Sequence, residues 1–219
     1  DSIVEIGPGE GALTEYIFSK VKEMAVVEID PILIELLHSR EDFNGLKIIN
    51  SDILTQQIDS LPVDNPVRIV GNIPYNITSP IIFWLIEQLH YWDDAYIMMQ
   101  KEVAKRLTAD VGTKSYGRLT IVAGAYLDFE YCFTIPPTVF IPKPKVESAI
   151  VKFTKRSSPA VEDKKYLRFN KLVSAAFSQR RKMLKNSLKA WDISEELKKE
   201  VDFNRRPETL TIEEFSSLV

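Results

Sequence analysis

Residues 72–75 read Asn-Ile-Pro-Tyr and combine a stiff turn with polar and aromatic side chains. Pro74 fixes its own φ and pushes the residue before it towards an extended conformation, so the carbonyls of this turn point in set directions. Asn72 adds a side-chain carbonyl, and Tyr75 adds a flat ring. Such a turn can hold a planar group with an exocyclic amine, such as adenine, because the amine donates hydrogen bonds and the ring stacks. Taken alone, it also fits an ordinary turn between a strand and a helix.

A glycine-rich segment near the start of the chain predicts a second binding element. Gly7, Gly9 and Gly11 lie between an apolar run and a helical pattern. Without a Cβ, glycine lets a ligand approach the backbone, and the N-terminus of a helix favours electron-rich groups. Glu28 ends the second predicted strand 21 residues after Gly7, a spacing at which an acidic side chain can hold two ribose hydroxyls. Asp52 follows the third predicted strand and can accept from an adenine amine, or it can cap a helix.

Apolar runs that alternate with helical patterns must position these residues. An α/β fold with a parallel sheet covered on both faces follows from this alternation. The two last strands are joined without a helix, so they predict an antiparallel hairpin at one edge of the sheet. Strands are expected at residues 2–6, 24–29, 46–50, 67–71, 95–99, 129–135 and 146–153. Because ligands of open α/β sheets bind at the carboxyl ends of the strands, Gly7, Glu28, Asp52 and Asn72 are expected at one edge.

These four positions favour a ligand that contains adenosine, either a hydride carrier or S-adenosyl-L-methionine. The turn at residues 72–75 separates the two, because a dehydrogenase has no need to grip an amine at its fourth strand. A methyl donor does need this grip, since the acceptor must be aligned with the sulfonium methyl.

At this point the sequence resembles a known family. Four segments resemble the donor and catalytic motifs of adenine-N6 methyltransferases, at residues 3–11, 27–30, 51–54 and 71–75. Four more resemble the small-subunit ribosomal RNA adenine dimethyltransferases, whose bacterial members are linked to kasugamycin sensitivity; they lie at residues 100–107, 116–119, 140–149 and 177–188. Members of that family have an N-terminal segment that packs over the donor site. We expect this chain to lack it and its donor site to be incomplete.

The resemblance implies a Rossmann-like class I methyltransferase sheet with a small C-terminal helical domain. It also implies that S-adenosyl-L-methionine supplies two methyl groups to N6 of each of two adjacent adenosines in a 3′-terminal hairpin loop of 16S rRNA, during maturation of the small subunit. Catalytic roles are implied for Asn72, Pro74, Tyr75 and Phe140, and donor binding for Gly7, Gly9, Glu28, Asp52, Ile53 and Asn72. Phe140 is expected either to stack on the target base or to anchor its proline-rich loop.

The charge distribution predicts a surface that faces RNA. Residues 164–190 contain nine basic side chains and no acidic one, so the rest of a chain with net charge −3 carries −12. Such a split indicates a polyanion-binding element on an acidic body. From residue 164 onwards the pattern is helical, and the basic side chains are expected on one helical face up to Lys189. Arg180, Arg181, Lys182 and Lys185 are the predicted phosphate partners.

Composition and spacing set the remaining expectations. The domains are expected at 1–155 for methyl transfer and 164–219 for RNA binding, with 156–163 as a linker. The single cysteine excludes an internal disulfide and a multi-cysteine metal site, and no metal is expected. The absence of a long apolar run predicts a cytoplasmic protein without membrane contact. We expect a monomer whose partner is small-subunit rRNA in an immature ribosomal subunit.

Three alternatives stay open at this stage. The substrate can be large-subunit rRNA, as in related antibiotic-resistance methyltransferases, or DNA, although the match at residues 177–188 argues against both. The protein can be a non-catalytic RNA-binding assembly factor on the same fold, although an intact turn at residues 72–75 argues against lost activity. The third alternative is a nicotinamide-dependent oxidoreductase.

Overall fold

The computed structural model describes residues 1–179 and 181–219. The chain forms two compact units. The first comprises Asp1–Lys101 and Glu130–Lys155, and the second comprises Glu102–Phe129 and Arg156–Val219. The units change at Lys155, where the first predicted domain ends, but they place Glu102–Phe129 with the C-terminal helices. The division into domains at 1–155, 156–163 and 164–219 stays a prediction.

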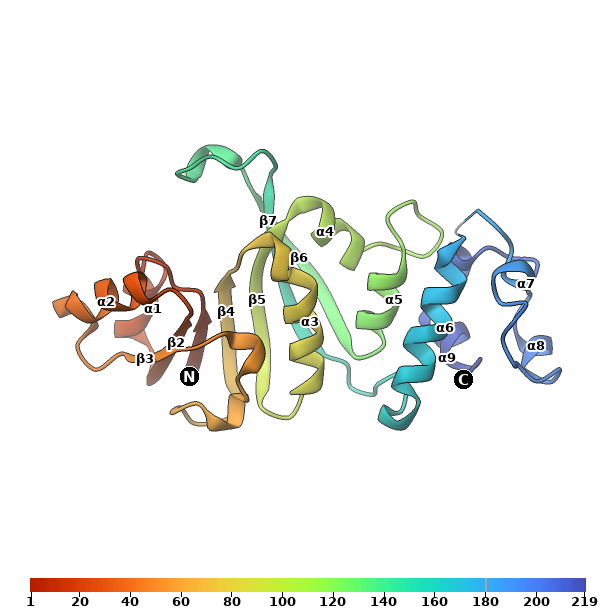
Figure 1. Cartoon of the computed structure of the whole chain (residues 1–219), viewed down its shortest axis with the longest axis horizontal. Coiled ribbons are helices and arrows are strands. Elements are labelled where there is room, and N and C mark those ends of the chain that lie inside the picture. Colours follow the sequence, from red (N-terminus) through yellow and green to blue (C-terminus); the bar gives the residue numbers. More distant parts are fainter. Residues whose placement is uncertain (180) are drawn as a thin grey trace. The chain divides into compact units, whose positions relative to one another are not determined.

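Among the described residues, seven strands form one sheet in the order β3-β2-β1-β4-β5-β7-β6 (Figure 1). The strands are β1 Ser2–Ile6, β2 Glu23–Glu28, β3 Lys47–Asn50, β4 Val67–Asn72, β5 Trp92–Gln100, β6 Leu127–Ile135 and β7 Ser148–Lys155. All pairs from β3 to β5 are parallel, whereas β5 and β7 are antiparallel. The predicted α/β class, with a mostly parallel sheet and an antiparallel edge, is confirmed.

Three helices of the first unit connect its parallel strands: α1 Thr14–Ile17, α2 Pro31–Ser39 and α3 Thr78–Glu87. The start of α2 shows why the chain turns where it does. The side chain of Asp30 accepts a hydrogen bond from the Ile32 amide at 2.9 Å, and Pro31 occupies the first turn, where its missing N–H costs nothing. Beneath this layer, Met24 and Val26 of β2 pack with Leu37 of α2 in a buried apolar cluster.

The second unit is helical. Its helices are α4 Lys101–Leu107, which starts at the last residue of the first unit's opening segment, α5 Arg118–Gly124, α6 Tyr166–Ser178, α7 Leu184–Ser187, α8 Leu197–Glu200 and α9 Ile212–Ser216. The predicted apolar face of α6 is confirmed, because Phe169, Leu172, Val173 and Ala176 are buried. None of the helices in the described residues is both long and apolar enough to cross a bilayer.

The prediction of one basic helical face from residue 164 to Lys189 is wrong. Helix α6 ends at Ser178, and α7 begins only at Leu184. The reason is a long-range contact: the amides of Leu184 and Lys185 donate to the carbonyls of Arg205 and Phe203, at 2.9 and 3.0 Å, instead of continuing a helical ladder. Local periodicity carries no information about such a partner.

Candidate functional site

The ends of four neighbouring strands bring the predicted site residues to one edge of the sheet. β1 lies between β2 and β4, and its last residue, Ile6, pairs with Val27 on one side and Gly71 on the other. Gly7 follows directly after β1, and Glu28 and Asn72 are the last residues of β2 and β4. β3 adds Asp52 shortly beyond its end. The expected juxtaposition of Gly7, Glu28, Asp52 and Asn72 at one sheet edge therefore follows from the strand order.

The glycine loop needs residues without a Cβ. Gly7, Gly9 and Gly11 have φ values of 63°, 60° and 87°, in the left-handed region that favours glycine. The Gly7 amide donates to the carbonyl of Val27 at 3.0 Å, which holds the loop against β2. A Cβ placed on Gly9 meets no atom of the described chain within 4 Å, so the loop is open to a ligand at this position.

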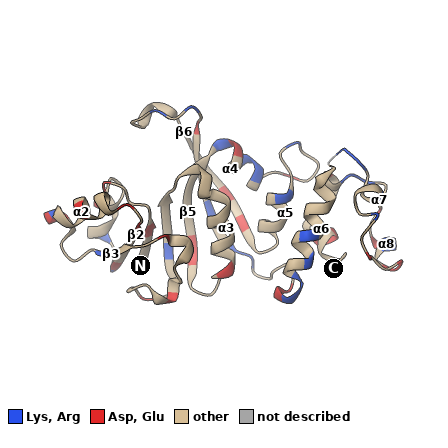
Figure 2. Ribbon diagram, viewed as in Figure 1, with Lys and Arg blue, Asp and Glu red and all other residues tan. Residues whose placement is uncertain are grey.

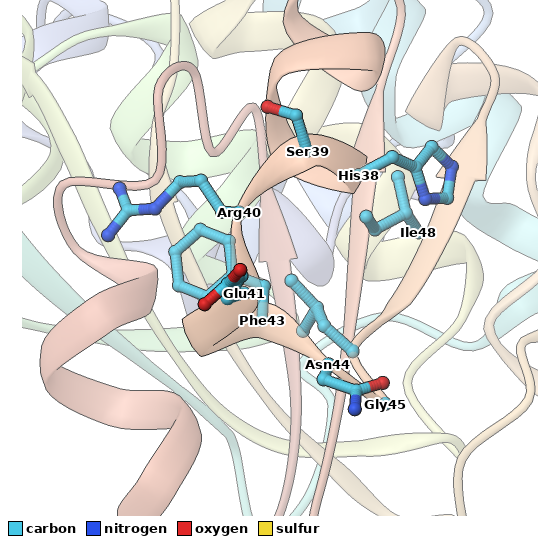
Figure 3. Close-up of a pocket in the computed structure, with 9 residues that line it drawn as sticks. His38, Ser39, Arg40, Glu41, Phe43, Asn44, Gly45 and Ile48 are labelled. Carbon is cyan, nitrogen blue, oxygen red and sulfur yellow. The ribbon is translucent and has the colours of Figure 1, made fainter.

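Residues 40–43 pack against the glycine loop. A Cβ on Gly11 lies only 2.5 Å from Cε2 of Phe43, so the ring fills the space that glycine leaves. Arg40 lies over the same ring, with its guanidinium carbon 4.1 Å from the ring centroid, and donates to the carbonyl of Glu10 at 3.0 Å. This support forms part of a hollow of about 520 Å³ (Figure 3), lined by His38, Ser39, Arg40, Glu41, Phe43, Asn44, Gly45, Leu46 and Ile48.

Glu28 is held rigidly at the end of β2. Its side chain is only 6% exposed, yet it carries three backbone hydrogen bonds. Oε1 accepts from the amides of Ile29 and Asp30 at 2.9 and 3.0 Å, and Oε2 accepts from Gly9 at 3.3 Å. The carboxylate therefore bridges the glycine loop and the end of β2, and the lone pairs that remain on Oε2 can accept from hydroxyls.

Asp52 and Ile53 follow β3 and shape a tight turn. The Asp52 carboxylate accepts from the Leu54 amide at 2.9 Å and caps the 3₁₀ turn Ile53–Thr55. This is the capping contact that the sequence offered as the alternative role. One carboxylate oxygen remains able to accept from a ligand. Ile53 is 5% exposed and anchors the turn in the core. The donor-binding roles of Asp52 and Ile53 stay predictions.

The last residue of β4, Asn72, faces solvent. Asn72 is exposed, whereas Ile73 is 2% exposed and packs inside. Within the described part of the chain, the Asn72 side-chain amide makes no hydrogen bond, so its oxygen is free to accept. The Pro74 carbonyl already accepts from the Ile77 amide at 3.1 Å, and its second lone pair remains. The turn at residues 72–75, called the corner below, thus offers two oxygen acceptors, Asn72 Oδ1 and the Pro74 carbonyl.

Tyr75 is fixed at both ends. Its hydroxyl lies 2.7 Å from the hydroxyl of Ser148, the first residue of β7. Its backbone carbonyl accepts from the Thr78 side chain at 3.1 Å, at the start of α3. The half-buried ring therefore has a set orientation beside Asn72. No local pattern predicts Ser148 as a partner, because the pair is separated by 73 positions.

The predicted catalytic residues line one cavity. It has a volume of about 320 Å³ and is lined by Asn72, Ile73, Pro74, Tyr75, Met98, Phe140, Ile141, Pro142 and Pro144. All four predicted catalytic residues thus meet at one hollow, although Phe140 lies more than sixty positions from the others. Phe140 is half-buried and reaches the hollow from the loop between β6 and β7. An adenine-sized group fits this combination of acceptors and rings.

Sequence reasoning missed Glu5, which lies two residues before the glycine loop. The side chain is 1% exposed, and the hydroxyl of Thr14 donates to its Oε2 at 2.6 Å. Burial raises the pKa of Glu5 to about 7. The pair joins the end of β1 to the first residue of α1 and so spans the glycine loop. The signal was present as one carboxylate inside the apolar run of residues 3–6.

Three of the four predicted RNA-binding residues are described, and they lie in the second unit. Arg181, Lys182 and Lys185 are exposed, and Arg180 lies outside the described residues. The Lys185 ammonium donates to the Asn204 side chain at 2.9 Å, which leaves its charge uncompensated. In Figure 2, blue marks basic residues along the ribbon of α6 and on the segment that leads to α7. Their contact with RNA stays a prediction.

Comparisons with known proteins agree with this geometry. The family model described as ribosomal RNA adenine dimethylase matches residues 1–219. The ribosomal RNA small subunit methyltransferase A of Coxiella burnetii is 40% identical over 222 residues, which cover 98% of this chain and 84% of that protein. The protein of the same name from Alcanivorax borkumensis is 41% identical over 222 residues and covers 100% of this chain and 79% of that protein.

Solved structures share the whole fold. A dimethyladenosine transferase from Plasmodium falciparum superimposes with a TM-score of 0.84 at 26% identity, over 100% of this chain and 88% of that chain. The 23S rRNA methyltransferase ErmE superimposes with a TM-score of 0.74 at 28% identity, over 99% of this chain and 88% of that chain.

Proposed function

We propose that this chain, which belongs to the ribosomal RNA adenine dimethylase family, transfers methyl groups from S-adenosyl-L-methionine to N6 of adenosines in small-subunit rRNA. The observation that carries the proposal is the meeting of Asn72, Pro74, Tyr75 and Phe140 at one hollow. The glycine loop is adjacent, because a Cβ on Gly7 lies 3.9 Å from the backbone oxygen of Asn72. Family membership supplies the reaction, and this arrangement supplies a place where an adenine can be held during it.

The edge formed by β1 to β4 fits the donor. When bound, S-adenosyl-L-methionine supplies an electrophilic methyl on its sulfonium. Glu28 is fixed by three backbone amides and can accept from the two ribose hydroxyls. Gly7 and Gly9 allow close approach to the backbone. Asp52 is assigned to the adenine amine of the donor and Ile53 to its ring face, and Asn72 belongs both to this edge and to the base pocket.

The corner at residues 72–75 activates N6 of the target adenosine, which is a poor nucleophile. The N6 lone pair is delocalised into the adenine ring. The Asn72 Oδ1 and a backbone carbonyl of residue 73 or 74 accept the two amine hydrogens, which favours a pyramidal nitrogen with its lone pair directed at the methyl. Tyr75 stacks on one face of the base, and Phe140 covers the other. This contribution is positioning and electrostatic stabilisation.

Proton loss needs no dedicated base. After transfer, N6 carries a positive charge and is acidic enough to release its proton to water. Asn72 is exposed, so water can reach the nitrogen held there and accept this proton. The second methylation of the same nitrogen then uses the same acceptors with one hydrogen fewer.

We also propose which part of the ribosomal RNA is the substrate. The substrate is two adjacent adenosines in a 3′-terminal hairpin loop of 16S rRNA, presented by an immature small subunit, and the enzyme works as a cytoplasmic monomer. The two relatives at 40–41% identity are both named small subunit methyltransferases, and the TM-score is 0.84 to the dimethyladenosine transferase against 0.74 to the 23S methyltransferase ErmE. These matches favour this substrate over large-subunit rRNA. The intact corner and the fixed Glu28 favour an enzyme over a non-catalytic assembly factor.

Transfer of labelled methyl groups to immature small subunits and to large-subunit rRNA tests the proposal. The full-length protein is expected to label the small subunit and to convert its adenosines to the N6-dimethylated form. Asn72→Ala is expected to lower the rate by about 10²- to 10³-fold, the cost of losing one preorganised polar group at a reaction centre. Asn76→Ala is the matched control, since Asn76 is an exposed asparagine four residues away.

Two outcomes contradict the proposal in different ways. Preferential labelling of large-subunit rRNA changes the substrate but keeps the enzyme class. Equal rates for Asn72→Ala and Asn76→Ala remove Asn72 from the chemistry. A third measurement separates the two adenosine ligands: Glu28→Gln is expected to weaken binding of S-adenosyl-L-methionine, and tight binding of a nicotinamide dinucleotide to the wild type contradicts a methyl-donor site.

A further inference from the structure

The loop between β6 and β7 exposes apolar side chains at the mouth of the base pocket. Ile141 and Val139 are 101% and 62% exposed. Both flank Phe140, which lines the pocket together with Ile141. Exposed isoleucine is common in isolation, but here it borders a hollow where a nucleobase is proposed to bind. Figure 1 shows this loop extending beyond the ends of β6 and β7.

The chemistry of the loop suits nucleic acid. Residues 131–146 contain no acidic side chain, and Lys143 and Lys145 are both exposed. Pro136, Pro137, Pro142 and Pro144 each fix a φ angle, so the loop loses little conformational entropy when a partner binds. An apolar tip flanked by lysines can insert beside a base while the ammonium groups contact the neighbouring phosphates.

The base of the loop is tied to the catalytic corner within the first unit. The Lys101 amide donates to the Glu147 carbonyl at 3.0 Å, and the side chains of the two residues form an ion pair at 2.8 Å. At the next residue, Ser148 contacts the Tyr75 hydroxyl. A side chain that projects from this loop therefore has a defined position relative to the Asn72 corner.

Resting on the function proposed above, we propose that Ile141 is a wedge that contacts the base next to the target adenosine and holds it out of the stack. A base can enter the pocket only after it leaves its neighbours, and this unstacking costs free energy. An inserted apolar side chain replaces part of the lost stacking contact. Because the two target adenosines are adjacent, the base against Ile141 is the second adenosine while the first is being methylated, or the reverse.

The test uses the full-length protein and a hairpin RNA in which one of the two adenosines is 2-aminopurine, whose fluorescence rises when it unstacks. Wild-type protein, without donor, is expected to raise the fluorescence. Ile141→Ala is expected to lose most of this rise at saturating protein. In a parallel assay on immature small subunits, the same variant is expected to transfer methyl groups about tenfold more slowly, the loss of one wedge contact.

Two variants control for general effects. Ile141→Leu keeps an apolar side chain of equal volume and is expected to restore both the fluorescence rise and the transfer rate. Val111→Ala removes an exposed apolar side chain, 44% exposed, from the other unit and is expected to change neither. Ile141 is fully exposed, so its truncation leaves the core intact, and an unchanged melting temperature for Ile141→Ala supports the wedge as the cause.

The outcomes for the wedge and for the proposed function are separable. A normal fluorescence rise and a normal transfer rate in Ile141→Ala overturn the wedge and leave the methyltransferase intact. No fluorescence rise with the wild type also overturns the wedge, whatever the transfer rate. A rise that depends on Ile141 in a wild type that transfers no methyl group supports the wedge and overturns the proposed reaction.

Discussion

The hydroxyl of Tyr75 lies 2.7 Å from the hydroxyl of Ser148, and this contact joins the corner after β4 to the first residue of β7. Ser148 is fully buried, so the bond is shielded from water. The residue also follows directly on the loop that carries Phe140. One hydrogen bond therefore sets the orientation of the Tyr75 ring. It also holds the end of the loop that carries Phe140 beside that ring.

Removing either hydroxyl of the Tyr75–Ser148 hydrogen bond is expected to lower methyl transfer by the same factor. Tyr75→Phe and Ser148→Ala each remove a bond worth about 1 kcal/mol, which corresponds to a loss of about fivefold in kcat/KM for methyl transfer. The double variant is expected to lose no more than either single variant, since the two residues share one interaction. Steady-state kinetics on immature small subunits measures all three.

A similar pair elsewhere in the first unit provides the control. The Tyr131 hydroxyl lies 2.6 Å from the Thr134 hydroxyl, and neither residue lines the pocket. Tyr131→Phe is expected to leave kcat/KM unchanged. Losses that add in the double variant, or an equal loss in Tyr131→Phe, contradict a specific role for the Tyr75–Ser148 contact.

The glycine loop allows backbone strain and packing to be separated. Gly9 and Gly11 both have positive φ, but only a Cβ on Gly11 meets a neighbour, Cε2 of Phe43 at 2.5 Å. Gly9→Ala is expected to lower the free energy of unfolding by about 1 kcal/mol through strain alone. Gly11→Ala is expected to cost a further 1 to 3 kcal/mol, roughly, because the core is overpacked. Chemical denaturation measures both, and equal losses contradict the packing role of Phe43.

How far the sequence predicted the site depended on the range of the contacts. Gly7, Glu28 and Asn72 were predictable as neighbours, because alternating strands and helices imply a parallel sheet whose strand ends share an edge. The strand order then places them side by side. Phe140 was connected to this edge through family resemblance, since nothing in its own segment indicates which strand it faces.

Contacts between distant segments were not predictable. Ser148 bonds Tyr75, and Phe43 fills the space under Gly11, but neither pair has a local pattern. The apolar positions Leu184 and Leu188 keep the helical spacing of α6 and are buried, yet the helix ends at Ser178. The spacing of apolar residues thus predicts that Leu184 and Leu188 are buried. It does not predict that the backbone leaves the helix, which results from the hydrogen bonds to residues 203–205.

Stability is expected to depend on pH through Glu5. Burial raises the pKa of Glu5 from 4.5 to about 7, so the folded protein binds this proton more tightly than the unfolded chain does. The stabilising contribution is complete below pH 4.5 and is lost as the pH rises to about 7. Glu5→Gln has no such proton. Its free energy of unfolding, relative to the wild type, is expected to rise by about 3 kcal/mol across this range.

Denaturation series at several pH values measure this difference. Glu10→Gln is the control, because the Glu10 side chain is exposed and water solvates it in both states. The control measures the effect of replacing an exposed carboxylate by an amide at each pH. A difference between Glu5→Gln and the wild type that stays constant with pH contradicts the shifted pKa of the buried carboxyl.

The basic segment before and within α7 is expected to make binding of RNA depend steeply on salt. Arg181, Lys182 and Lys185 are exposed, and each phosphate they neutralise releases counterions from the RNA. Replacing any one with alanine is expected to reduce the slope of log Kd against log salt by about 0.7 to 0.9. Lys199→Ala is the control, since Lys199 is exposed but lies beside Glu196 and Glu200 in and next to α8. Fluorescence anisotropy of labelled hairpin RNA measures the slopes. An unchanged slope in all three variants excludes these side chains as phosphate contacts. The slope counts the counterions that are released when charged side chains meet phosphates, so it reports the loss of a charge even if alanine also changes the affinity.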